Sequence, residues 1–180
     1  IVGERAEMTG VRLDDGTELP ADLVIVAAGV RPDAALAREA GLTIGATGGV
    51  VVDAQFRTSD PRIRAVGDVA EKQDAVLGGA VSVPLAGPAN LHGRLVADAI
   101  MGREVRVAPT AGVAIVGAFG LVAASVGVTE KRAREAGLAI RVIHAHAPHH
   151  VGYYPGARLL ALKLVVAADD DRILGAQVVG

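Results

Sequence analysis

Short apolar runs that end at a glycine mark the first half of the chain. One run covers residues 23–28 and ends at Gly29, and a second covers residues 63–66 and ends at Gly67. Apolar runs without alternation are typical of strands buried on both faces, as in parallel sheets. We therefore expect a strand at each run, followed by a turn at its glycine.

Turn and stop residues predict the elements around these strands. Asp15 and Gly16 lie between short alternating runs and predict a hairpin over residues 11–19. Residues 34–40 read as a short helix that Gly41 ends, and a longer helix begins near Pro84 and ends at Gly102.

The pattern changes near residues 107–109. Residues 113–128 are rich in valine and small residues and predict strands, and Thr129 is a suitable N-cap for a helix that Gly137 ends. Residues 140–148 alternate as a strand does, and two further strands flank the acidic turn at residues 168–171. One helix among several antiparallel strands indicates an α+β domain in the second half.

Composition limits the classes of protein to consider. About half of the 180 residues are apolar, and the net charge of −2 gives no basic face. We therefore expect no nucleic-acid partner and no anionic membrane partner. No apolar run reaches the length of a spanning helix, and no signal peptide is visible, so we expect a cytoplasmic protein. The sequence has no cysteine, which excludes a disulfide or a thiolate site within it.

Both ends of the sequence read as strands already in progress. The chain opens on Ile1 and closes on the apolar segment "RILGAQVVG". We expect it to be part of a longer polypeptide, since raw edge strands at both termini are unfavourable.

Gly67 and Asp68 carry the clearest candidate chemistry. A glycine followed by an acid at the carboxyl end of a sheet strand lies where open α/β sheets bind ligands. Gly67 lets a ligand approach the backbone, and Asp68 can accept hydrogen bonds from sugar-like hydroxyls. Alternatively, Asp68 caps the following turn. The helix near Ala86 offers N–H groups and a positive dipole end at its start, or is an ordinary amphipathic helix.

Four motifs in order resemble the FAD-dependent pyridine nucleotide–disulfide oxidoreductases: "LVIVAAGVRPD", "TSDPRIRAVGDV", "PLAGPANLHGR" and "YYPGA". The resemblance runs over the whole chain and is strongest to the coenzyme A disulfide reductase branch, which includes NADH oxidases and peroxidases. It implies an α/β FAD/NAD(P)-binding (Rossmann-like) portion followed by an α+β dimerisation domain. The implied domains are the tail of the NAD(P)H-binding domain (1–33), the end of the FAD-binding domain (34–108) and an incomplete dimerisation domain (109–180).

The resemblance also implies roles for particular residues. The aspartate after the strand glycine holds the ribityl chain of FAD in the family, and it maps onto Asp68 with Gly67. A glycine near the bound nicotinamide nucleotide maps onto Gly29. The segment that faces the flavin ring maps onto Pro84, Leu85, Ala86 and Gly87.

A catalytic tyrosine is implied for the coenzyme A branch. In that branch a tyrosine of the partner subunit reaches the active site of a homodimer, and the candidates are Tyr153 and Tyr154. Both precede Pro155 and Gly156, so the rings lie at a defined bend. Neighbours on an extended segment point opposite ways, which predicts that one ring packs inward and the other projects.

The implied activity is hydride transfer from NAD(P)H through FAD to a cysteine centre and then to a disulfide such as coenzyme A disulfide. The alternatives are an NADH oxidase or peroxidase of the same family, or a non-catalytic dimerisation segment. The family's two G-x-G-x-x-G motifs and its redox cysteine are absent from this sequence. We therefore expect this chain alone to be inactive.

Histidines cluster before the tyrosines. The members are His144, His146, His149 and His150. Imidazoles at alternate strand positions share a face and could bind zinc or nickel. No carboxylate or cysteine lies near them in sequence, so we favour a polar strand end beside the active site and expect no metal.

Overall fold

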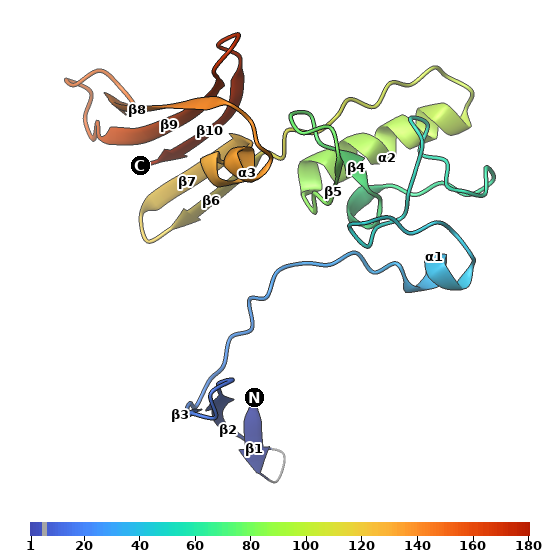
Figure 1. The fold of residues 1–180 in the computed structure, drawn as a ribbon, viewed down its shortest axis with the longest axis horizontal. Coiled ribbons are helices and arrows are strands. Elements are labelled where there is room, and N and C mark those ends of the chain that lie inside the picture. Colours follow the sequence, from blue (N-terminus) through green and yellow to red (C-terminus); the bar gives the residue numbers. More distant parts are fainter. Residues whose placement is uncertain (5–6) are drawn as a thin grey trace. The chain divides into compact units, whose positions relative to one another are not determined.

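A computed structural model describes residues 1–4 and 7–180 (Figure 1). The chain divides into two compact units, Ile1–Arg31 and Pro32–Gly180. Each unit is described separately below.

The first unit is a small antiparallel sheet. Its strands are β1 (Val2–Glu4), β2 (Glu7–Arg12) and β3 (Glu18–Pro20), in that spatial order. Gly16 has a φ of 87° and allows the turn between β2 and β3, where glycine is favoured because it has no Cβ. The hairpin predicted over residues 11–19 is confirmed.

The strand predicted over residues 23–28 is wrong. The segment is irregular, and its side chains are exposed, with Ile25 at 80% and Leu23 at 75%. A strand buried on both faces needs neighbouring strands to accept its backbone hydrogen bonds. No strand in the described part of the chain pairs with this segment.

The second unit begins with short elements and one long helix. These are α1 (Ala35–Glu39), the 3₁₀ turn η1 (Gly67–Val69), β4 (Lys72–Gln73), β5 (Ala80–Val81) and α2 (Ala86–Ile100). Both predicted helices are confirmed, and Gly41 and Gly102 follow them with φ of 74° and 77°. No helix in the described residues is long and apolar enough to cross a bilayer.

The strand predicted over residues 63–66 is also wrong. Instead of joining a larger sheet, this segment pairs with the residues just before it through one isolated antiparallel bridge, between Arg57 and Arg64. Thr58 N–H donates to Ile63 O at 3.0 Å, and Ala65 N–H donates to Phe56 O at 3.0 Å. A turn connects the two sides, with Ile63 N–H donating to Asp60 O at 2.9 Å.

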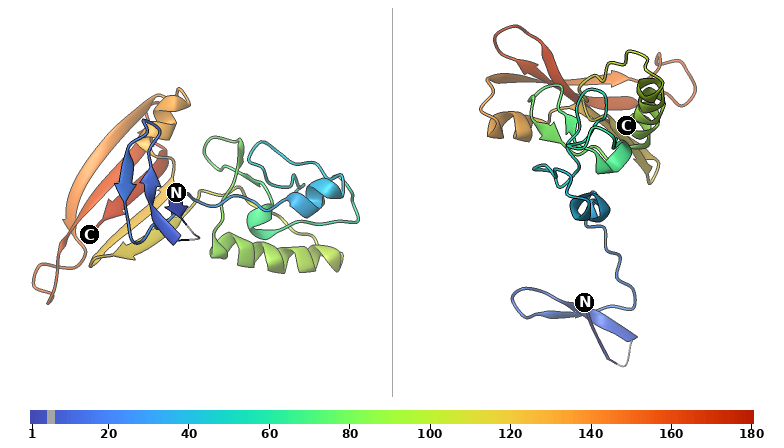
Figure 2. Two further views of the ribbon diagram at one scale, coloured as in Figure 1. Left: turned by 90° about the horizontal axis from the view of Figure 1, so that it is seen from below. Right: turned by 90° about the vertical axis from the view of Figure 1, so that its right-hand side faces the viewer.

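The rest of the unit is a five-stranded antiparallel sheet with one helix. The strands are β6 (Ala114–Ala118), β7 (Leu121–Gly127), β8 (Ile140–Pro148), β9 (Leu159–Ala167) and β10 (Ile173–Val179). Their spatial order is β6-β7-β10-β9-β8. The helix is α3 (Glu130–Glu135), and the Thr129 side chain caps it as predicted by accepting from Arg132 N–H at 3.3 Å. Figure 2 shows the five strands side by side.

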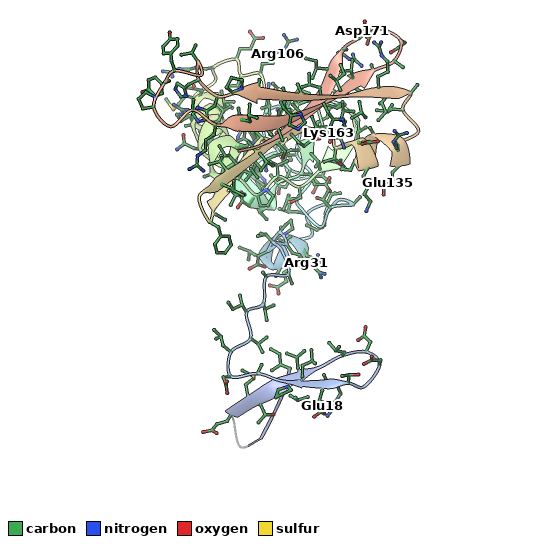
Figure 3. The ribbon with its side chains drawn as sticks, turned by 90° about the vertical axis from the view of Figure 1, so that its left-hand side faces the viewer. Glu18, Arg31, Arg106, Glu135, Lys163 and Asp171 are labelled. Carbon is green, nitrogen blue, oxygen red and sulfur yellow. The ribbon has the colours of Figure 1, made fainter. Side chains whose placement is uncertain are left out.

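The core of this sheet lies under α3. Its buried members are Val128, Ala133, Val165, Ala167 and Leu174. Lys163 of β9, labelled in Figure 3, forms an ion pair with Glu130 of α3, with 2.6 Å between Nζ and Oε2. This bond and one from Arg134 lower the Glu130 pKa to about 2. The Lys163–Glu130 pair joins the helix to β9, whereas the Arg134–Glu130 pair lies within α3.

A buried carboxylate joins the α2 half of the second unit to this sheet. The Asp74 side chain accepts from Val76 N–H at 2.8 Å and Leu77 N–H at 2.9 Å, and it pairs with Arg132 of α3 at 3.3 Å. Val76 and Leu77 pack against the sheet core, and Thr110 forms a parallel bridge with Asp74. Asp74 therefore fixes the segment that passes between the two halves.

Truncation of Val165 should destabilise the protein, because this side chain is fully buried in the sheet core. We expect Val165→Ala to lower the free energy of unfolding by about 1.5–3 kcal/mol, from lost apolar burial plus a cavity. Chemical denaturation measures the change. Val26→Ala is the matched control, since Val26 is 70% exposed. Equal losses in the two variants would contradict the assigned core.

Neutralising Asp74 should remove a pH-dependent part of the stability. Burial raises the Asp74 pKa, but hydrogen bonds from Leu77, Val76 and Arg132 outweigh it, so the pKa lies below 3.8. The charged form therefore stabilises the fold above that value, and the contribution is lost as the pH falls through the folded pKa. We expect Asp74→Asn to cost about 1–2 kcal/mol at pH 7 and progressively less below about pH 4. A difference between the two proteins that stays constant from pH 7 to pH 2.5 would refute this role.

Candidate functional site

The Gly67–Asp68 turn presents a carboxylate to solvent. Val66 is extended, Gly67 has a φ of 77°, and Asp68 follows in η1. The Asp68 side chain is exposed, and no hydrogen bond from another described residue reaches its carboxylate. The alternative role for Asp68, as a cap of the following turn, therefore has no hydrogen bond to support it. The carboxylate is available to a ligand.

A buried lysine lies beneath this turn. The Lys72 ammonium donates to Gly67 O at 2.6 Å and to Ala70 O at 3.2 Å, and the residue is only 7% exposed. Burial lowers the Lys72 pKa, and the negative charge of Asp68 acts in the opposite direction. The turn is therefore bonded to a cation on its inner side.

An aromatic wall closes the space beside Lys72. The Phe56 and His92 rings pack with centroids 5.1 Å apart, and both residues are buried. Burial lowers the His92 pKa, and the nearby Lys72 charge lowers it further. Phe56 has a φ of 63°, which is unfavourable for a bulky residue, and burial of its ring offsets this strain. A cavity of about 160 Å³ lies next to these three side chains.

The amino end of α2 offers free N–H groups at the same edge. Leu85 is the N-cap residue and supplies no side-chain cap, and the first turn has no acidic residue. Ala86 and Gly87 are exposed, and no described group accepts from their N–H groups. A Cβ built on Gly67 would lie 3.9 Å from the Ala89 Cβ, so η1 lies directly against the start of α2, as Figure 1 also shows.

The segment before α2 lines a second cavity, of about 270 Å³. Pro84 and Leu85 form part of its wall, together with Ser82 and with Arg132 of α3. Pro84 and Leu85 are half-buried, whereas Ala86 and Gly87 are exposed. The structure thus brings Asp68, Gly67 and the whole predicted flavin-facing segment into one region.

The two tyrosines lie elsewhere, in the loop between β8 and β9. Tyr153 is 89% exposed and projects from the loop. Tyr154 is half-exposed and stacks on His150, with ring centroids 4.5 Å apart and planes at 15°. Tyr153 projects as predicted, but the prediction that the other ring packs inward is wrong, because Tyr154 stacks on a loop residue and stays 52% exposed.

The histidines share this end of the sheet. His144 and His146 lie on β8, and His149 contacts His150 through their Nδ1 atoms. Arg158 N–H donates to His149 Nε2 at 3.3 Å. Among the described residues, no three histidine or acidic side chains gather as a metal site would require.

Gly29 belongs to the first unit, whereas the other predicted site residues belong to the second. It has a φ of 83°, and a Cβ built there would meet no atom within 4 Å. Its proposed closeness to a nicotinamide nucleotide stays a prediction.

The groups around η1 fit FAD, the cofactor that the family resemblance implies. An exposed carboxylate suits the hydroxyls of a ribityl chain, and a glycine without Cβ gives the chain room. Free N–H groups at a helix start suit the carbonyl edge of a flavin ring, because the helix dipole favours negative charge there.

Sequence reasoning missed Lys72 and His92. His92 could have been found, because it lies four residues before Val96 and seven before Ala99, on the apolar stripe of α2. Lys72 gives no such signal, since it stands between glutamate and glutamine in a polar stretch.

Comparison with known proteins gives the family. Residues 1–112 match the family model of pyridine nucleotide-disulphide oxidoreductases, and residues 113–180 match the model of their dimerisation domain. An NAD(P)H sulfur oxidoreductase (CoA-dependent) from Pyrococcus furiosus is 36% identical over 168 residues, which are 93% of this chain and 38% of that protein.

Two solved structures are similar over nearly the whole chain. An NAD-dependent persulfide reductase from A. fulgidus has 40% identity and a TM-score of 0.88, over 95% of this chain and 33% of that one. A reduced CoADR-RHD from Bacillus anthracis has 39% identity and a TM-score of 0.90, over 96% of this chain and 31% of that one. The chain therefore spans well under half the length of each relative.

These matches confirm the expected fold class, an α/β portion followed by a dimerisation domain, and the resemblance to the coenzyme A disulfide reductase branch. Proteins of this family use FAD and NAD(P)H. The chain belongs to the pyridine nucleotide-disulphide oxidoreductase family.

Proposed function

We propose that this chain forms the FAD contacts, part of the nicotinamide pocket and the dimer surface of an NAD(P)H-dependent oxidoreductase. The proposed substrate is a disulfide or persulfide of the coenzyme A type, and the proposed assembly is a homodimer. The observation that carries this proposal is the exposed Asp68 carboxylate beside the uncapped start of α2.

The proposed role of the residues in this chain is to bind FAD and to orient it. When bound, FAD supplies the hydride chemistry of the reaction. Asp68 accepts hydrogen bonds from the hydroxyls of the ribityl chain of FAD. Gly67 has no side chain, so the ribityl chain can approach the backbone there. The N–H groups of Ala86 and Gly87 donate to an acceptor that carries negative charge.

The names of the relatives support the substrate class. The Pyrococcus protein is named as a CoA-dependent sulfur oxidoreductase and the A. fulgidus protein as a persulfide reductase. We propose the division into residues 1–33, 34–108 and 109–180 for the intact enzyme.

The sheet of the second half supports the proposed homodimer. Apolar side chains stand exposed along β6 and β7, where Ile115 is 73% and Val116 is 63% exposed. Residues 113–180 match a dimerisation domain, so a second copy of the chain is the proposed cover for such side chains.

Loss of the Asp68 carboxylate should release the flavin. In the full-length protein, we expect Asp68→Ala to weaken FAD binding by about 10- to 150-fold, the value of one hydrogen bond to a charged group. Titration of the apoprotein with FAD, followed by flavin fluorescence, measures the affinity. Asp169→Ala is the control, since Asp169 is an exposed acid in the β9–β10 turn. Unchanged FAD affinity in Asp68→Ala would overturn the assignment.

One tyrosine hydroxyl should act in turnover. We propose that one phenol, of Tyr153 or Tyr154, reaches the substrate across the homodimer. Tyr→Phe at that position removes only the hydroxyl, and we expect a loss of turnover of about 10- to 1,000-fold while the protein stays a flavin-loaded dimer. Steady-state kinetics with coenzyme A disulfide measures the loss. If both single variants keep the turnover and substrate affinity of the parent, the two tyrosines have a structural role only.

A further inference from the structure

Lys72 is a buried charge that the stability of the fold does not explain. The residue is 7% exposed, and burial lowers its pKa despite the opposing effect of Asp68. The surroundings therefore disfavour the ammonium relative to a lysine in water, so its charge costs folding stability. No described carboxylate forms a hydrogen bond or an ion pair with it. The reason for the charge has to be sought in the groups that it contacts.

The ammonium contacts the backbone on both sides of Asp68. Gly67 O precedes the Asp68 peptide nitrogen, and Ala70 O follows two residues later. Because both carbonyls bond to one cation, rotation of the intervening backbone would break a charge-assisted hydrogen bond. The two bonds draw the carbonyls inward, and the Asp68 side chain is left on the exposed side.

A second anchor holds the opposite end of the turn. Val50 N–H donates to Val69 O at 2.7 Å, and Glu71 N–H donates to Val50 O at 2.9 Å. The turn is thus held between the Val50 backbone and the Lys72 side chain. The Lys72 side chain lines a cavity together with His92 and Phe56, whose rings pack against each other.

We propose that Lys72 is a positioning residue for FAD binding, which it serves by holding the Gly67–Val69 turn so that the Asp68 carboxylate faces outward beside the start of α2. This inference rests on the proposed function. Lys72 itself does not touch the cofactor in this arrangement; it acts through Asp68. Preorganisation of this kind raises affinity because the ligand does not have to order the turn on binding.

A double-mutant cycle in the full-length protein tests the inference. FAD affinity is measured on the apoproteins of the parent, Lys72→Met, Asp68→Asn and the double variant. Methionine keeps most of the volume of the lysine chain and removes the ammonium. We expect Lys72→Met to weaken FAD binding by about tenfold in the parent and by less than about twofold when Asp68 is already asparagine. Lys131→Met is the matched control, since Lys131 is 85% exposed on α3, and it should leave the affinity unchanged.

The outcomes of the cycle separate the two proposals. Equal losses from Lys72→Met in both backgrounds would show that Lys72 acts independently of Asp68 and would overturn its positioning role. Unchanged affinity in Lys72→Met, with a loss in Asp68→Asn, would also overturn it and would leave the proposed function intact. If Asp68→Asn keeps the parent affinity, the proposed function loses its carrying residue, and the inference fails with it.

A second measurement needs no variant and covers the case in which Lys72→Met does not fold. Coupling is reciprocal, so if the Lys72 bonds favour FAD, then bound FAD must favour the Lys72 bonds. Reductive methylation of apoprotein and FAD-loaded protein, followed by mass spectrometry of peptides, gives the reactivity of each lysine. We expect bound FAD to slow methylation of Lys72 by about tenfold and to leave exposed Lys131 unaffected. Equal Lys72 rates with and without FAD would overturn the inference.

Discussion

The carboxylate of Asp74 is the interaction on which the second unit depends. It binds two backbone N–H groups of the segment before β5 and the guanidinium of Arg132 on α3. The same segment carries Val76 and Leu77 into the core of the five-stranded sheet. One buried charge therefore connects the site around η1 and α2 with the sheet that carries the tyrosine loop.

Local signals were enough to predict the second half of the chain. Alternating residues gave β8, the acidic turn gave the β9–β10 hairpin, and Thr129 gave the start of α3. Antiparallel strands joined by short turns carry their own partners nearby in sequence, so the pattern of each strand is interpretable by itself. The two strands expected in the first half failed for the opposite reason. A strand of a parallel sheet is defined by partners far away in sequence, and its apolar run alone does not supply them.

Candidate site residues were predictable where they belong to a local turn pattern. They were not predicted where their role depends on burial in the fold. Gly67 and Asp68 stood out because a glycine followed by an acid after an apolar run is typical of a ligand-binding turn in an α/β sheet, although the same pair can cap a turn. Lys72 became visible only when the fold placed it under the turn, whereas the position of His92 on the apolar stripe of α2 was a signal that sequence reasoning overlooked. Burial of a polar side chain depends on contacts between distant segments, such as that of His92 with Phe56.

The order of the strands has a consequence for handling the protein. β6 stands at an edge of its sheet, and its five residues are exposed along their whole length. An edge strand with unpaired N–H and C=O groups and with Ile115 and Val116 open to solvent is a template for adding another strand. Purified without a cover for this edge, the chain should associate with itself in proportion to its concentration.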